Sequence, residues 1–122
     1  MQPKQRVLVV ADRTAESPEL IAALRRRTEA GPAGFTLLVP AATEGFAWSD
    51  STQAAWSRAI CRAELAASRI RHAGLELEEA IVGDPDPVTA AGDARHAREF
   101  DQVVFLRPRR DRRAPSPVSA AA

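Results

Sequence analysis

The stretch Ile81-Val82-Gly83-Asp84-Pro85-Asp86-Pro87-Val88 joins an apolar segment to a helix start, and this junction indicates the fold of the chain. Its first residues are typical of a buried strand, and the two prolines prevent that strand from continuing. Asp86 and Pro87 are typical of a helix start, because the carboxylate caps a free backbone N–H and proline in the first turn loses no needed donor. A strand that passes directly into a helix predicts a βα unit, the repeating element of α/β proteins.

A second strand end of this kind, Val7-Leu8-Val9-Val10-Ala11-Asp12, lies near the beginning of the chain. Its continuous apolar run is typical of a strand that is buried on both faces of a sheet. The carboxyl ends of parallel strands meet at one edge of the sheet, where open α/β proteins bind small molecules. We therefore expect Asp12 and Gly83 to lie together at this edge.

The segment between these two strands predicts two helices and one further strand. Ser17 and Pro18 predict the start of the first helix, and Gly31-Pro32 predicts its end. Residues 35–39 form the second predicted strand, and residues 51–73 form a long helix. The spacing of apolar residues predicts that the buried face of this long helix contains Trp56, Ile60, Ala63, Ala67 and Ile70.

The remaining signals complete a regular alternation of strands and helices. Gly74 followed by Leu75 predicts a helix end at which glycine takes a positive φ and the next apolar residue packs back. The alternating stretch 75–78 predicts a third strand at an edge of the sheet, and residues 103–106 predict a fourth strand. The order β-α-β-α-β-α-β over residues 1–106 predicts a three-layer α/β/α sandwich with a parallel four-stranded sheet.

Residues 107–122 differ in composition from the rest of the chain. They mix arginine, proline, serine and alanine without an apolar period, which predicts a disordered tail. Five arginines and one aspartate between residues 107 and 113 give this tail a charge of +4, whereas the net charge of the whole chain is +1 and that of the rest is −3. Because the body is acidic, a nucleic-acid-associated function that depends on the tail is the least favoured of the functions considered.

The strand ends and their order resemble those of the universal stress proteins. These UspA-like domains have an adenine-nucleotide-binding α/β fold of the adenine nucleotide alpha hydrolase-like or flavodoxin-like type. The resemblance covers residues 5–106. It rests on the first strand with its closing Asp12, on Leu37-Leu38-Val39, on the turn Gly83-Asp84-Pro85 and on Phe100-Asp101-Gln102-Val103-Val104. It implies that Asp12, Val39 and Gly83 hold the base and ribose of an adenine nucleotide such as ATP or AMP.

The chain also departs from the family pattern after its fourth strand. ATP-binding members have a glycine-rich loop there, followed by a fourth helix and a fifth strand, whereas this chain has Leu106-Arg107-Pro108-Arg109-Arg110. The resemblance therefore implies a divergent or truncated member in which nucleotide binding is weak or lost. Without a fourth helix and a fifth strand, residues 103–106 would be partly exposed, and pairing with a second subunit would cover them. We expect a homodimer that forms through the fourth strand.

Several function classes have no support in the sequence. The chain has no G-x-G-x-x-G or Walker loop, no G-x-S-x-G elbow and no metal-ligand spacing, so we expect neither an enzymatic role nor a bound metal. No apolar run approaches the roughly 20 residues that a membrane helix needs. Cys61 is the only cysteine, which suits a reducing cytoplasm, and we expect it to be a partly buried side chain of the long helix.

Two functional interpretations remain open at this stage. The first is a cytoplasmic, bacterial stress-response domain of the universal stress protein type that works by protein association. The second is an adenine-nucleotide-binding module that uses Asp12 and the Gly83 turn, with arginines of the tail in place of the glycine-rich loop.

Overall fold

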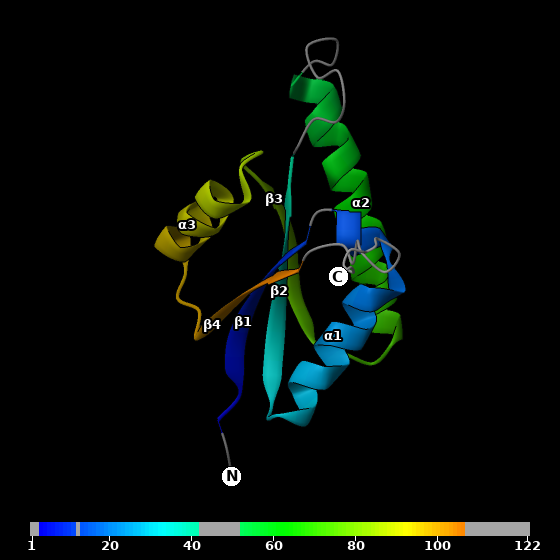
Figure 1. The fold of residues 1–122 in the computed structure, drawn as a ribbon, viewed down its shortest axis with the longest axis vertical. Helices are drawn as coiled ribbons and strands as arrows, with labels where there is room; N and C mark the ends of the chain where they lie inside the picture. Colours follow the sequence, from blue (N-terminus) through cyan, green and yellow to red (C-terminus); the bar gives the residue numbers. More distant parts are fainter. Residues whose placement is uncertain (1–2, 12, 42–51, 107–122) are drawn as a thin grey trace, which may run out of the picture.

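A computed structural model describes residues 3–11, 13–41 and 52–106, which form a parallel sheet with helices on both of its faces (Figure 1). The elements follow one another as β1 (Gln5–Ala11), η1 (Arg13–Glu16), α1 (Pro18–Glu29), β2 (Ala33–Pro40), α2 (Thr52–His72), β3 (Leu77–Gly83), α3 (Pro87–Ala97) and β4 (Gln102–Leu106). The predicted α/β class and the three-layer sandwich are thereby confirmed. The predicted tail, residues 107–122, lies outside the described residues.

The four strands lie in the order β3-β2-β1-β4, and every neighbouring pair is parallel. β1 and β2 occupy the centre, so Val9 of β1 lies beside Leu37 on one side and Val104 on the other. All residues of β2 are buried, which explains its almost continuous apolar sequence. β3 and β4 are the two edges of the sheet in the described part of the chain, and the edge position predicted for the third strand is confirmed.

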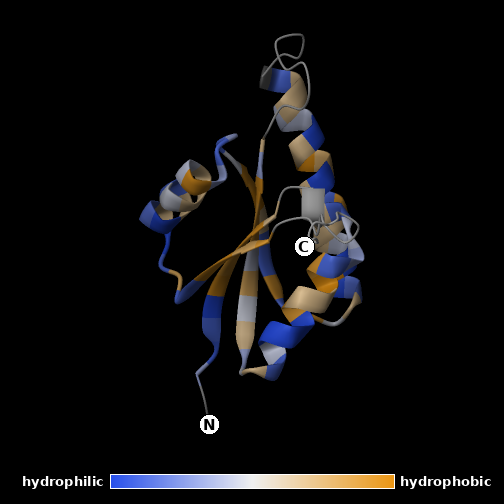
Figure 2. Ribbon diagram, in the orientation of Figure 1, coloured by the Kyte–Doolittle hydropathy of each residue, from blue (hydrophilic) through white to orange (hydrophobic). Residues whose placement is uncertain are grey.

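Two helices cover one face of the sheet, as Figure 1 shows for α1 and α2 on the right of the view. The core on this face is built around Phe35, which is 1% exposed, together with alternate residues of β1 and β2. Leu20 and Leu24 of α1 enter this core, while α2 contributes mainly alanines. Figure 2 shows the same division, with hydrophobic strands in the centre and hydrophilic residues on the outer sides of the helices.

Among the described helices, α3 is the one that covers the other face. Three alanines of this helix, Ala90, Ala91 and Ala94, pack against Leu8, Val10 and Leu38. Because an alanine side chain is a single methyl group, the helix axis lies close to the sheet. α3 packs mainly against β3, β2 and β1, so β4 receives little cover from it.

The predicted helix ends are confirmed in detail. The side chain of Ser17 accepts a hydrogen bond from the backbone N–H of Glu19, with Pro18 as the first residue of α1. Gly74 has a φ of 84°, and the following Leu75 packs back against the core. Leu75 therefore belongs to the helix end, and β3 begins at Leu77 rather than at the predicted residue 75.

The prediction for the buried face of α2 was partly wrong. Ala63, Ala67 and Ile70 are buried as predicted, and Trp56 packs partly buried against the core. Ile60, however, is 45% exposed, because the face that contacts the sheet is centred on Ala59 and Ala66. Cys61 is also exposed rather than partly buried, since it lies still further around the helix from that face.

Candidate functional site

The carboxyl edge of the sheet is the place where the sequence predicts a ligand site. The register pairs Ala11 with Leu106 and Pro40 with Gly83, so all four strands end at this edge. Asp12, which follows Ala11 in the sequence, lies outside the described residues. Its predicted role in holding a nucleotide therefore stays a prediction, as does the meeting of Asp12 with Gly83.

Val39 and Gly83 are both described, and each has a clear structural role. The side chain of Val39 is fully buried in the core beneath α1 and α2. At Gly83, a Cβ atom would lie 3.0 Å from the Cβ of Ala90 and 3.0 Å from the Cδ1 of Leu38. Glycine at this position lets α3 approach the sheet closely, which accounts for it without a ligand. Contact of either residue with a nucleotide stays a prediction.

The first turn of α3 is the other feature of this edge that could bind an anion, because backbone N–H groups at a helix start are free. Here the protein's own carboxylates occupy several of them. Asp86 Oδ2 accepts hydrogen bonds from the backbone N–H of Thr89 at 3.1 Å and from its hydroxyl at 2.7 Å. Asp84 Oδ1 accepts a hydrogen bond from the backbone N–H of Asp86 at 2.9 Å. These two carboxylates make the turn unfavourable for a phosphate group.

These contacts also lower the pKa of Asp86. The hydrogen bonds from the Thr89 hydroxyl and from the backbone N–H groups of Thr89 and Val88 hold the pKa of Asp86 below its ordinary value of 3.8. The bonds favour the ionised form, since only a carboxylate accepts all of them. Asp86 is therefore a helix cap, as predicted, and it remains charged at neutral pH.

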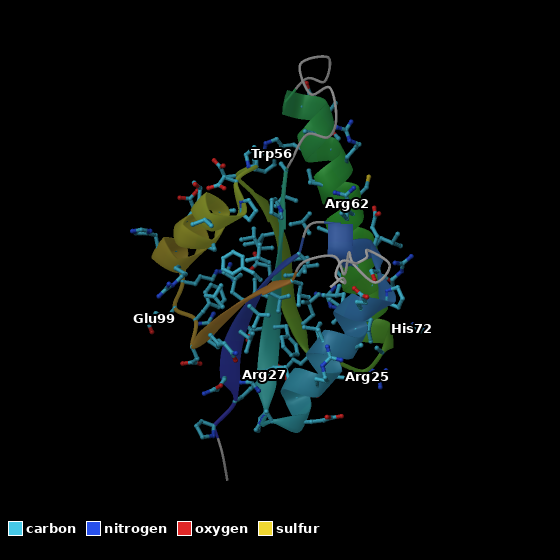
Figure 3. All side chains as sticks on the ribbon, in the orientation of Figure 1. Arg25, Arg27, Trp56, Arg62, His72 and Glu99 are labelled. Carbon is cyan, nitrogen blue, oxygen red and sulfur yellow. The ribbon has the colours of Figure 1, made fainter. Side chains whose placement is uncertain are left out.

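An arginine that the sequence reasoning did not single out fixes the chain after β1. Arg62 of α2, labelled in Figure 3, has a side chain that is only 13% exposed, and its Nε donates to Glu16 Oε2 at 2.9 Å. Arg69 of the same helix donates to the backbone carbonyl of Glu16 at 3.2 Å. Glu16 lies in η1, which directly follows Asp12. The pairing joins residues 46 positions apart, so no local sequence signal could have indicated it.

The described residues contain no group of three or more His, Cys, Asp or Glu side chains that could hold a metal ion. An open groove of about 800 Å³ lies between α2 and β3, and Glu64, Arg71, His72 and Glu79 are among the residues that line it. Neither Val39 nor Gly83 lines this groove. Among the described helices, none combines the length and the apolar character needed to cross a bilayer.

The two edge strands, β3 and β4, differ in charge and in the regularity of their pairing. At β3 the register shifts between Phe35 and Thr36, whose partners are Leu77 and Glu79, so Glu78 is an extra residue that bulges. Glu78 and Glu79 are charged, and they pair with Arg6 and Arg98 respectively. Bulges and charges are two of the devices by which natural sheets prevent edge-to-edge pairing.

β4, in contrast, has none of these protections. Its sequence Gln102-Val103-Val104-Phe105-Leu106 contains no charged residue and no proline, and its register with β1 is regular. Phe105 is 43% exposed, and the three apolar residues around it are only partly buried. Within the described residues β4 pairs with β1 alone, and no described strand pairs with its other side. This edge is the second candidate site, and it has the character of a protein contact.

β4 is nevertheless firmly held on its inner side. Arg27 of α1 donates from Nε to Gln102 Oε1 at 2.7 Å and from NH2 to Gln5 Oε1, and so ties β4 to β1. Its NH1 also donates to the carbonyl of Gly31 at 3.3 Å. The edge is therefore an ordered strand, and Arg27, labelled in Figure 3, is a further residue that sequence reasoning missed.

Comparison of the chain with models of known protein families finds no match, and a search of curated proteins finds none either. The resemblance to universal stress proteins therefore rests on the strand ends and turns quoted above.

Replacing Gly83 tests whether helix packing explains this residue. We expect Gly83→Ala to lower the free energy of unfolding by about 1–3 kcal/mol, because the added methyl group meets Ala90 and Leu38. Gly92→Ala is the matched control, since nothing lies within 4 Å of its would-be Cβ and alanine favours a helix by about 0.5–1 kcal/mol. Urea denaturation measures both. A Gly83→Ala protein as stable as the wild type would contradict the packing explanation.

The cap at Asp86 predicts a specific dependence on pH. Since its pKa is lower in the folded state, its stabilising contribution is complete above the ordinary value of 3.8 and is lost as pH falls through the lowered pKa. Asp86→Ala should therefore melt at a lower temperature than the wild type at pH 7, with the difference shrinking below pH 3.8.

The control for this pH dependence is Ser17→Ala. The Ser17 hydroxyl caps α1 without a charge, so its loss should cost about 1 kcal/mol at every pH. A difference in stability between Asp86→Ala and the wild type that stayed constant down to about pH 2.8, one unit below the ordinary pKa of 3.8, would show that the carboxylate charge is irrelevant.

Proposed function

We propose that the protein is a divergent, cytoplasmic domain of the universal stress protein type that works by protein association rather than by catalysis. The observation that carries the proposal is the unprotected edge at β4. The backbone N–H and C=O groups of an ordered edge strand that carries no charge can form hydrogen bonds with another strand. The opposite edge carries a bulge and two glutamates, so the contrast is a property of β4 and not of the sheet in general.

The partner that we propose is a second copy of the same chain. Exposed apolar residues on an edge favour aggregation in a monomer, and a closed dimer removes them from water. Phe105 supplies the largest apolar side chain of this edge. Because Phe105 is 43% exposed, covering its remaining surface contributes about 0.5–1.5 kcal/mol per subunit, in addition to the hydrogen bonds between the strands.

The described residues give less support to adenine-nucleotide binding than to association. Gly83 is accounted for by helix packing, and the start of α3 carries two carboxylates where a phosphate would have to bind. We therefore propose that any affinity for ATP or AMP is in the millimolar range or weaker.

Thermal shift with nucleotides tests this part directly. At a ligand concentration near the dissociation constant, the stabilisation is only about 0.4 kcal/mol, which corresponds to about 3 °C or less for a domain of this size. We expect ATP, ADP and AMP at about 1 mM to raise the melting temperature by no more than this amount. A rise of about 10 °C would instead indicate tight binding and favour the nucleotide-binding function.

A substitution on β4 tests association. We expect Phe105→Glu to raise the dimer dissociation constant at least about 30-fold, because a carboxylate replaces the largest apolar contact of the edge. Leu65→Glu is the matched control: Leu65 is 51% exposed on α2, which packs on the face of the sheet opposite α3, and its replacement should leave the dissociation constant unchanged. Sedimentation equilibrium measures both. A wild-type chain that stays monomeric at high micromolar concentration would refute the proposal.

A further inference from the structure

A row of arginines lies along the side of α2 that faces η1 and α1. Arg58, Arg62 and Arg69 fall within about 40° of one another around α2, since each residue turns a helix by about 100°. Together they cover a rise of about 16 Å along the helix axis. Arg25 of α1 joins them at the C-terminal end of α2, where its NH2 donates to the carbonyl of Ala73 at 3.4 Å (Figure 3). We call these four arginines the arginine row.

Two members of the arginine row are held in place without being neutralised. Arg69 NH1 donates to the backbone carbonyl of Glu16 at 3.2 Å, and Arg25 likewise donates to a backbone carbonyl. Neither forms an ion pair with a described carboxylate, whereas Arg62 pairs with the carboxylate of Glu16. A carbonyl group orients a guanidinium group but carries no compensating charge. Arg25 and Arg69 therefore present oriented positive charges with N–H groups left for a further acceptor.

The helical layer that carries the arginine row is basic, whereas another part of the molecule is acidic. η1, α1 and α2 together hold eight arginines and four glutamates, which give a charge of +4. Residues 74–101, which include β3 and α3, hold eight acidic residues and two arginines, which give a charge of −6. This separation of charge attracts negatively charged molecules to the α1 and α2 side and repels them from α3.

We infer that the arginine row binds an extended, acidic segment of a partner protein. Guanidinium groups form paired hydrogen bonds with carboxylates. Alternate residues of an extended chain lie about 6.6 Å apart, which is close to the rise of about 6 Å between Arg58 and Arg62. α2 packs against β2 and β3, and β4 is the opposite edge strand, so this inference goes beyond the proposed dimer and does not depend on it.

The surroundings of the arginine row favour a peptide over a nucleic acid. Leu65 is 51% exposed and lies between Arg62 and Arg69 in α2, so an apolar side chain of a peptide can contact it. The carboxylate of Glu16, bonded to Arg62, would repel a continuous line of phosphates. A peptide can place an uncharged residue at that point and its carboxylates beside Arg25 and Arg69.

Neutral substitutions in the arginine row test this inference. A fluorescein-labelled oligoglutamate peptide of about eight residues is the probe, and fluorescence anisotropy at about 50 mM salt, where exposed charges are less screened, measures its binding. We expect Arg25→Gln and Arg69→Gln each to raise the dissociation constant about threefold, because each removes one exposed charge pair. The double variant should raise it about tenfold.

Arg71→Gln is the matched control, because it removes the same charge from the other side of α2. Arg71 donates to the carbonyl of Leu77 at 3.5 Å and lines the groove beside β3 together with Glu64 and Glu79. Its replacement should change the dissociation constant of the peptide by less than about 1.5-fold. Circular dichroism checks that each variant is folded.

The inference is wrong if the wild type shows no saturable binding up to about 1 mM peptide, or if Arg71→Gln weakens binding as much as Arg69→Gln. A DNA duplex of equal charge that binds more tightly than the peptide would also overturn it, because the arginine row would then recognise phosphates. Sedimentation equilibrium of Arg69→Gln keeps the two proposals apart. Its dimer dissociation constant should equal that of the wild type, so loss of peptide binding leaves the proposed association standing.

Discussion

β1 pairs with a strand on each side, with β2 along one edge and β4 along the other, and the remaining features of the fold depend on this double pairing. It places β1 and β2 in the centre, where both faces must be covered. α1 and α2 cover one face and α3 covers the other. In the part of the chain that the structure describes, it also leaves β3 and β4 as the two edges of the sheet. The contacts that the sheet can make with other molecules therefore depend on the residues of its two edge strands.

The position of α3 connects the centre of the sheet to the properties of β4. Ala90 and Gly83 are in close contact, and this contact holds the start of α3 above β3 and β2. An eleven-residue helix in this position reaches β1 but gives little cover to β4. Phe105 is consequently exposed on the side of the sheet where α3 lies. Gly83, which belongs to the turn quoted for the family resemblance, thus has a packing role here, and the resulting position of α3 leaves Phe105 of β4 largely uncovered by that helix.

Much of the fold could be predicted from the sequence because its signals are local. The uninterrupted apolar runs of β1 and β2 indicate burial on both faces. The alternating stretch 75–78 predicts an edge strand, and β3 is an edge strand, although only its last two residues, Leu77 and Glu78, belong to β3. The caps at Ser17 and Asp86 depend on residues two or three positions away, so they too are visible in the sequence. The prediction was wrong for Ile60, because apolar spacing marks a helix face only to within about one residue. In α2 the residues that face the sheet are mainly alanines, and Ile60 lies beside that face rather than on it.

The candidate site was harder to predict because it depends on distant contacts. The bulge at Glu78 arises from the register between β2 and β3, and nothing near Glu78 in the sequence indicates it. Arg62 and Arg27 reach partners 46 and 75 residues away. Gly83 could be singled out as unusual, but only the position of Ala90 shows why it is a glycine.

Hydrogen–deuterium exchange at low and at high protein concentration tests most directly whether β4 is the contact between subunits. If β4 is the contact, amides of residues 103–106 become protected as the protein concentration rises, while the exchange of those of residues 78–82 does not change. Protection that appears at β3 instead, or a dimer in which β4 exchanges as fast as in the monomer, would contradict it.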